Sequence, residues 1–177
     1  MNATEREQAR FEVLRQLEQA GIVLTETEKH HLEITDLGLG RFAEIGLGLV
    51  VYVNTARVCA KELVLLPWQI CPEHRHPAVL DGSGKEETFR CRRGQVFLYV
   101  PGEPARTPKG RVPADKQECF TVWHEILLNP GEQYTLAPDT LHWFQAGPEG
   151  AVISEFSTTS RDEYDIFTDP QVQRVAS

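Results

Sequence analysis

Short apolar runs separated by turn residues are the feature that most constrains how this chain can fold. From residue 34 onward the runs have strand length and are rich in Val, Ile, Leu and aromatic residues. They cover residues 41–45, 48–54, 63–71, 87–92, 95–100, 119–128, 133–137, 141–146 and 150–157. The turn signals between them are Asp81-Gly82, Arg93-Gly94, Pro101-Gly102, Asn129-Pro130-Gly131 and Gly147-Pro148. Many short strands at roughly even spacing predict an all-β sandwich or barrel.

The first 33 residues have a different, helical pattern. Apolar residues recur at helical spacing over residues 4–20, and Gly21 ends the run. Thr4 and Glu7 have the spacing of a capping box, in which each side chain accepts a hydrogen bond from the other residue's backbone N–H. A second short helix is expected to begin at Thr25.

The length of 177 residues suits one domain. We expect residues 1–33 to form a helical lead and residues 34–177 the barrel. Within the barrel, residues 101–118 are polar and rich in Pro and Gly, which predicts a long surface loop.

Charge and cysteine content exclude several classes of protein. The formal net charge of −8 argues against nucleic-acid or anionic-membrane partners, which require a basic face. No apolar stretch approaches the roughly 20 residues of a membrane-spanning helix. The four cysteines contain no C-x-x-C pair, so we interpret them as reduced thiols of a cytosolic protein.

A segment with two histidines carries the strongest chemical signal. On an extended chain, His74 and His76 point to the same face and could bind one ion. Alone, such a pair could equally be two polar residues at a strand end. Glu87 follows eleven residues after His76, and His142 stands at a predicted strand start after a turn. This mixed set of nitrogen and oxygen donors suits Mn²⁺, Fe²⁺, Co²⁺, Ni²⁺ or Zn²⁺.

These residues follow a known order. An H-x-H pair, a glutamate, six further residues and Gly94, with a later histidine, resemble the two motifs of the cupin family. The resemblance implies a jelly-roll β-barrel in which His74, His76, Glu87 and His142 bind one divalent metal.

The chain also departs from the common cupin pattern. Trp68 stands where a glycine is usual, ten residues separate His76 from Glu87, and the second motif lacks its usual asparagine. The long gap leaves a choice between Glu86 and Glu87. The two-residue period of a strand and the step to Gly94 favour Glu87.

A closer resemblance concerns residues 64–168. The stretch CPEHRHP…GKEETFRCRRGQVFLYVPGEP, with its Lys-x-Glu sequence, is similar to the D-lyxose isomerase family of cupins. It implies a sugar isomerase that interconverts D-lyxose and D-xylulose, with D-mannose and D-fructose as a second pair, and that uses Mn²⁺. Isomerisation through a cis-enediol requires a cation for the oxygens and a carboxylate that moves the proton.

Two residues are candidates for that proton chemistry. Glu155 is a charge inside an otherwise apolar predicted strand, and in a barrel interior it could act as the general base. Lys85 could bind substrate oxygens and polarise the carbonyl. On burial frequencies alone, both residues could instead face solvent.

Three further residues are candidates for substrate binding. Asp165 and Arg161 lie in a charge-rich C-terminal run, and such runs are commonly solvated. Trp68 could stack on a sugar ring, although core packing is the commoner role of an aromatic residue. His124 lacks the turn-to-strand context of His142, so we expect it to be structural. We expect a homodimer, since open sheet edges invite pairing.

Two other functions remain open on the residues alone. A cupin dioxygenase would use Fe²⁺ with open coordination positions. A non-catalytic sugar- or metal-binding cupin would give Lys85 and Glu155 no catalytic role.

Overall fold

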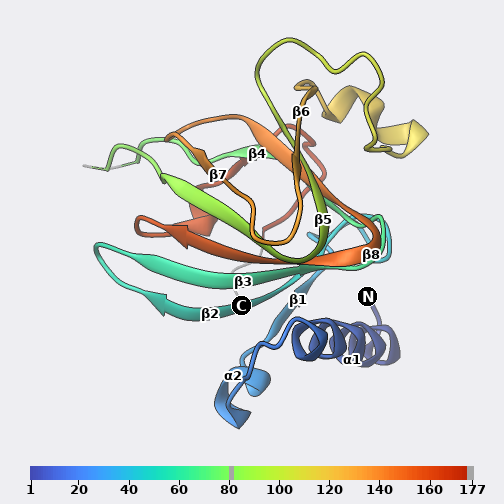
Figure 1. The fold of residues 1–177 in the computed structure, drawn as a ribbon, viewed down its shortest axis with the longest axis vertical. Helices are drawn as coiled ribbons and strands as arrows, with labels where there is room; N and C mark the ends of the chain where they lie inside the picture. The colour runs from blue at the N-terminus through green and yellow to red at the C-terminus, as the bar shows by residue number, and fades with distance from the viewer. Residues whose placement is uncertain (80–81, 175–177) are drawn as a thin grey trace.

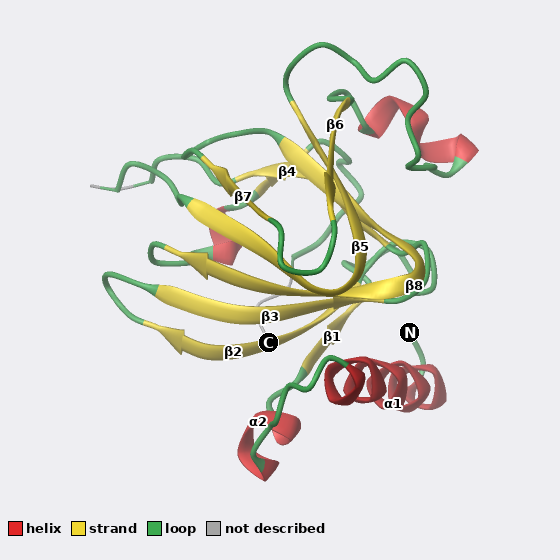
Figure 2. Cartoon of the chain, viewed as in Figure 1, coloured by secondary structure: helices red, strands yellow, loops and turns green. Residues whose placement is uncertain are grey.

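The computed structural model describes residues 1–79 and 82–174, so Asp81 of the expected Asp81-Gly82 turn lies outside the described residues. Helices and strands follow one another along the chain as Figures 1 and 2 show. The elements are α1 (Ala3–Gln19), α2 (Glu26–His30), β1 (Glu33–Thr35), β2 (Leu47–Asn54), β3 (Cys59–Leu65), β4 (Ile70–Arg75), β5 (Glu87–Val100), the 3₁₀ helix η1 (Ala114–Cys119), β6 (His124–Leu128), β7 (Gln133–Leu136), β8 (His142–Ser157), the 3₁₀ helix η2 (Asp162–Tyr164) and β9 (Ile166–Phe167).

The strands form one curled antiparallel sheet (Figure 1). Its main path runs β1-β2-β3-β8-β4-β9, and β5 pairs with β8, β6 and β7. The two longest strands, β5 and β8, pair along most of their length and bend with the sheet. The prediction of a cupin-type all-β fold behind a short helical segment is confirmed.

Two predicted turns lie inside continuous strands. The register of β5 against β8 shifts on either side of Gly94, so a bulge replaces the expected Arg93-Gly94 turn. Gly94 has φ of +74°, and a Cβ there would lie 1.9 Å from the carbonyl oxygen of Gly150. Strand β8 likewise continues through Gly147-Pro148. The glycines allow sharp bending within the ladder, which a sequence pattern cannot distinguish from chain reversal.

Other strand predictions also need correction. The single strand expected at 63–71 is broken into β3 and β4, because Trp68 adopts a left-handed conformation between them. Residues 41–45 form turns, with only an isolated bridge at Ile45. The run at 119–128 shortens to β6. The brief strands β1 and β9 lie outside the predicted runs.

The cap of the first helix lies two residues earlier than expected. Asn2 caps α1 and forms the capping box with Glu5 instead of the predicted pair Thr4 and Glu7. The predicted cap of the second helix, Thr25, does cap α2. No helix among the described residues has the length and hydropathy required to cross a membrane.

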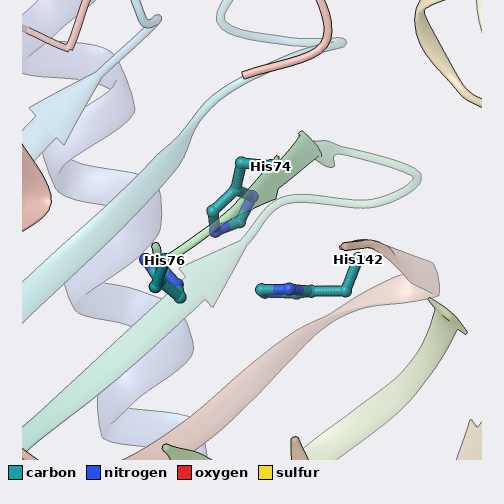
Figure 3. Close-up of side chains that lie close together, drawn as sticks. All are labelled: His74, His76 and His142. Carbon is teal, nitrogen blue, oxygen red and sulfur yellow. The ribbon is translucent and has the colours of Figure 1, made fainter. Parts of the chain in front are cut away.

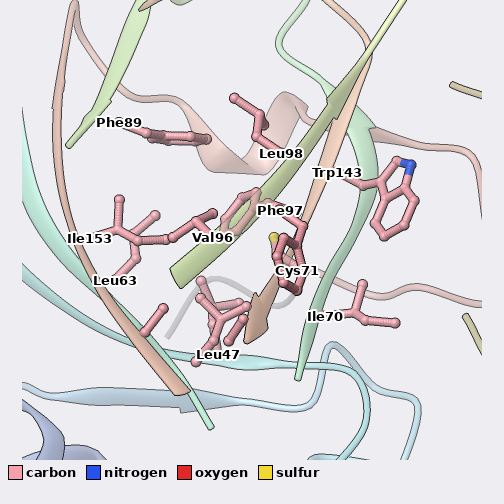
Figure 4. Packing of buried hydrophobic residues seen from close by; sticks show 14 of the residues in the cluster. Leu47, Leu63, Ile70, Cys71, Phe89, Val96, Phe97, Leu98, Trp143 and Ile153 are labelled. Atoms are coloured by element: carbon pink, nitrogen blue, oxygen red, sulfur yellow. The ribbon is translucent and has the colours of Figure 1, made fainter. Parts of the chain in front are cut away.

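Because side chains alternate between the two faces of a strand, the sheet has one apolar cluster inside the barrel and a second on its outer face. Leu47 and Leu49 of β2 face the barrel interior (Figure 4 shows part of this cluster), whereas Val50 faces outward. Helix α1 covers that outer face, with Val13 against Gly48, where a Cβ would lie only 2.6 Å from the valine side chain.

Alternation also explains a buried charge near the end of β8. Ala151 and Ile153 of this strand point into the barrel, and Val152 points outward. Glu155 continues the inward series and is 3% exposed.

Candidate metal centre and active site

Three histidines from two strands meet inside the barrel. His74 lies near the end of β4, His76 follows just beyond the strand, and His142 begins β8. His74 and His142 are direct partners in the β4–β8 ladder. One ring nitrogen from each of the three residues lies within 4.8 Å of the others, and Figure 3 shows the imidazoles grouped together.

Glu87, the first residue of β5, completes the group. Its Oε1 lies 3.2 Å from Nε2 of His76 and 3.2 Å from Nε2 of His142. Its neighbour Glu86 is exposed. The structure therefore brings Glu87, and not Glu86, to the histidines.

The outer nitrogen of each ring has an oxygen acceptor. Nδ1 lies 2.8 Å from the Pro72 carbonyl in His74, 2.9 Å from the Thr140 carbonyl in His142, and 2.5 Å from Asp165 Oδ1 in His76. With the proton on Nδ1, each Nε2 is left with a free lone pair, as metal ligation requires.

The inner polar atoms are buried and have no hydrogen-bond partner among residues 1–79 and 82–174. This holds for Nε2 of His76, Nε2 of His142 and Oε1 of Glu87. Buried polar atoms are normally satisfied, and leaving them unpaired costs free energy. A divalent cation bound by His74, His76, Glu87 and His142 would satisfy all three, so this donor set fits such an ion.

Burial holds two of the imidazoles in the neutral state that ligation requires. It lowers the pKa of His142 to about 4 and, with the charges of His142 and His76, lowers the pKa of His74 well below its usual range. Burial also opposes the charge of His76, but Glu87 and Asp165 outweigh it and raise the pKa of His76 to about 9. A cation that binds at His76 would therefore have to displace a proton.

Lys85 joins Glu87 to Glu155. Its Nζ lies 2.7 Å from Glu87 Oε2 and 2.6 Å from Glu155 Oε1, and its side chain is 6% exposed. Burial favours the neutral amine, yet Glu155 and Glu87 outweigh it and raise the pKa of Lys85 well above its usual range. The ammonium thus stays charged between two carboxylates.

Two adjoining cavities open at this group. The inner one, of about 50 Å³, contains His74, Glu87 and Glu155 in its wall. The outer one measures about 310 Å³ and includes Arg161. Both include His76, Lys85 and Asp165. The volume of the outer cavity is typical of sites that bind small molecules, whereas the inner cavity alone is too small to hold one.

Not all predicted site residues are brought together. Trp68 lies at the opposite end of β4, in a separate surface hollow with the Arg111 guanidinium 4.9 Å from its ring centre. His124 bonds to the backbone carbonyl of Glu103 and takes no part in the histidine group.

The wall of the inner cavity also includes charged and aromatic residues that the sequence analysis did not single out, among them Lys61, Asp162, Phe167 and Arg174. The alternation Cys59, Lys61, Leu63 along β3 could have marked Lys61 as inward-facing. The other three lie in the irregular C-terminal segment, where periodicity gives no signal.

Comparison with known proteins settles the family. The model of the family described as "D-lyxose isomerase" matches residues 14–177. The chain belongs to the D-lyxose isomerase family. It is 60% identical to the D-lyxose ketol-isomerase of Thermofilum sp. (strain ex4484_79), over 95% of this chain and 93% of the relative. It is 58% identical to the D-lyxose ketol-isomerase of Cohnella laeviribosi, over 99% of this chain and 96% of the relative.

A third relative and one solved structure extend the D-lyxose isomerase comparison. The D-lyxose/D-mannose isomerase of Thermosediminibacter oceani is 60% identical, over 90% of this chain and 88% of the relative. The structure of Cellulomonas parahominis L-ribose isomerase with L-ribose superposes with a TM-score of 0.80 at 14% identity, covering 98% of this chain and 95% of that one. At this identity the likeness shows the fold alone.

Proposed function

We propose that this member of the D-lyxose isomerase family interconverts D-lyxose and D-xylulose, and D-mannose and D-fructose as a second pair. Family membership makes the chain an aldose–ketose sugar isomerase, which disfavours the dioxygenase and the non-catalytic cupin. The names of the relatives support D-lyxose and D-mannose as substrates. The observation that carries the proposal is the Lys85 bridge, which places Glu155 beside the four-residue donor set.

We propose Mn²⁺ as the cation, held by His74, His76, Glu87 and His142. Three nitrogens and one carboxylate suit it, although Co²⁺, Fe²⁺, Ni²⁺ and Zn²⁺ can occupy the same donors. When bound, the ion supplies Lewis-acid stabilisation of the charge that develops on the two sugar oxygens.

Glu155 is the proposed general base. Its carboxylate takes the proton from C2 of the aldose and returns it to C1, while the hydroxyl proton moves from O2 to O1. The barrel wall excludes water around this residue, which is 3% exposed, and so strengthens its electrostatic interactions. Lys85 holds the carboxylate in place and donates hydrogen bonds towards the substrate oxygens.

The outer cavity is the proposed seat of the rest of the sugar. Arg161 is part of its wall, and the Nη1 of this residue is buried without a hydrogen-bond partner among the described residues. A sugar hydroxyl would satisfy that donor, which supports a substrate-binding role for Arg161. Trp68 precedes β4 and lines the separate surface hollow, so it has no place in this proposal.

The assembly and compartment are also proposals. Open sheet edges support a homodimer. The cysteines are free thiols, which supports the cytoplasm as the working compartment.

Metal removal and reconstitution test the function. Protein stripped with a chelator should lose activity, and reloading with Mn²⁺ should restore ketose formation from D-lyxose without oxygen uptake. A panel of pentoses and hexoses ranks the substrates. Oxygen consumption, or no turnover of any sugar by the Mn²⁺-loaded protein, would contradict the proposal.

A further inference from the structure

The segment from Arg161 to Arg174 packs against the proposed metal site. Within it, β9 extends the sheet beside β4, with Phe167 opposite His74 in the ladder. The Phe167 ring stacks on the His74 imidazole at a centroid distance of 5.2 Å and an interplanar angle of 25°. The C-terminal segment is therefore part of the wall around the histidines.

The three histidines differ in how their rings are held. His74 and His142 each use the backbone carbonyl two residues before them, at Pro72 and Thr140. Each of these acceptors belongs to the same short stretch of backbone as the histidine that it contacts. His76 lies beyond the end of β4 and instead uses the Asp165 side chain, 89 residues away in sequence.

The Asp165 carboxylate is buried and contacts the His76 ring. Its side chain is 8% exposed, and its Oδ1 lies 2.5 Å from His76 Nδ1. Among the described residues, no lysine or arginine forms an ion pair with it. A carboxylate that accepts the Nδ1 proton fixes the tautomer and orientation of an imidazole and makes its other nitrogen a better ligand.

We propose that Asp165 is a positioning residue that aims His76 Nε2 at the cation, in place of the substrate contact that the sequence suggested. The inference rests on the proposed metal site. It predicts that Asp165 acts on metal affinity through His76, while the substrate contacts lie elsewhere.

Ion pairs hold the segment that carries Asp165. Before it, Asp162 pairs with the buried Lys61 of β3 at 2.9 Å. After it, Arg174 pairs with Glu33 of β1 and, at 3.2 Å, with Asp162. Asp165 thus lies between two attachments to the barrel, which limits its movement away from His76.

The test compares Mn²⁺ affinity in the full chain, measured by chelator competition starting from loaded protein. Asp165→Ala should weaken binding about 10- to 100-fold, the usual cost of removing such a partner. Asp165→Asn should weaken Mn²⁺ binding less than Asp165→Ala does, because its amide oxygen still accepts a hydrogen bond. Glu163→Gln is the matched control, since Glu163 is an exposed carboxylate in the same segment, and it should bind as the wild type does.

Thermal unfolding shows whether each variant is folded. If Asp165→Ala does not fold, the Mn²⁺ affinity of the isosteric Asp165→Asn tests the proposal. Mn²⁺ affinity within about twofold of wild type in the folded variants would overturn the proposal. So would a raised KM for D-lyxose at unchanged Mn²⁺ affinity, because it would make Asp165 a substrate contact. A wild-type chain that does not hold Mn²⁺ would overturn the proposed function itself.

Discussion

At the scale of single residues, the site is organised by buried opposite charges. Lys85 lies between Glu87 and Glu155, and all three side chains are 6% exposed or less. A buried ion pair requires good geometry to offset the desolvation of its members. Here that geometry fixes the proposed base at a short distance from the proposed metal ligands.

The proposed base gives the first prediction. Glu155→Gln keeps the shape of the side chain but removes its basicity, so kcat should fall by about 10²- to 10⁴-fold. Mn²⁺ content, measured by atomic absorption, should remain at the wild-type value. Glu86→Gln, at an exposed glutamate, is the control and should be fully active. A fully active Glu155→Gln would exclude Glu155 as the base.

Much of the site was predictable at this scale. The spacing of His74, His76, Glu87 and His142 predicted one shared donor set, and the structure brings the four side chains together. A charge in an apolar strand marked Glu155, which lies beside Lys85. The contact between Asp165 and His76 was not predictable, because it joins two irregular segments that only the tertiary fold brings together.

At the scale of elements, glycines decide where the strands bend. Gly94 has a positive φ and no room for a Cβ beside Gly150. Sequence patterns located the strands because apolar runs report burial. They mistook this bulge for a turn, since glycine marks both features.

Gly94→Ala tests this explanation. Both strain and a clash with backbone act at this position, so the free energy of unfolding should fall by at least about 2 kcal/mol in urea titrations. Gly131 has φ of +91°, but no atom lies within 4 Å of the position that a Cβ would take there. Gly131→Ala should therefore cost only about 1 kcal/mol. Equal costs at the two positions would show that the contact with Gly150 is unimportant.

The ion pairs of the C-terminal segment predict a pH dependence of stability. Burial opposes the charge of Asp162, but Lys61, Lys85 and Ser160 outweigh it and hold the pKa of Asp162 below its usual range. A lowered folded-state pKa contributes stability above the unfolded value, and the contribution is lost as the pH falls below about 4.

Asp162→Asn should therefore destabilise the protein by about 3 kcal/mol at pH 7, since it leaves Lys61 buried without its partner. The difference from wild type should shrink as the pH falls below about 4, which urea titrations at several pH values can follow. Asp115→Asn, at an ion pair with an exposed carboxylate, should change stability by less than about 1 kcal/mol. A deficit of Asp162→Asn that is independent of pH would contradict this account.

At the scale of the whole molecule, the helical lead and the barrel share a core. Leu17 of α1 is 1% exposed and packs in the cluster that includes Val64 and Val152 of the sheet. The helical lead was predictable from its periodicity, but the face on which it packs was not. Val13 of α1 can approach the sheet only because Gly48 has no side chain, and a sequence pattern does not show that the two residues meet.

We therefore predict one cooperative unfolding transition for the chain. Leu17→Ala should cost about 2–5 kcal/mol and shift the whole transition, followed by circular dichroism and tryptophan fluorescence together. Phe11→Ala, at a 65% exposed position on the same helix, should be nearly silent. A separate early transition of the helix would mean that the lead folds independently of the barrel.

The central claim is that His74, His76, Glu87 and His142 bind one shared cation. Anomalous diffraction from Mn²⁺-loaded crystals measures this most directly. We predict a single manganese peak within coordination distance of Nε2 of the three histidines and of the Glu87 carboxylate. A manganese peak elsewhere, or a His142 ring turned away from the other two, would contradict the account.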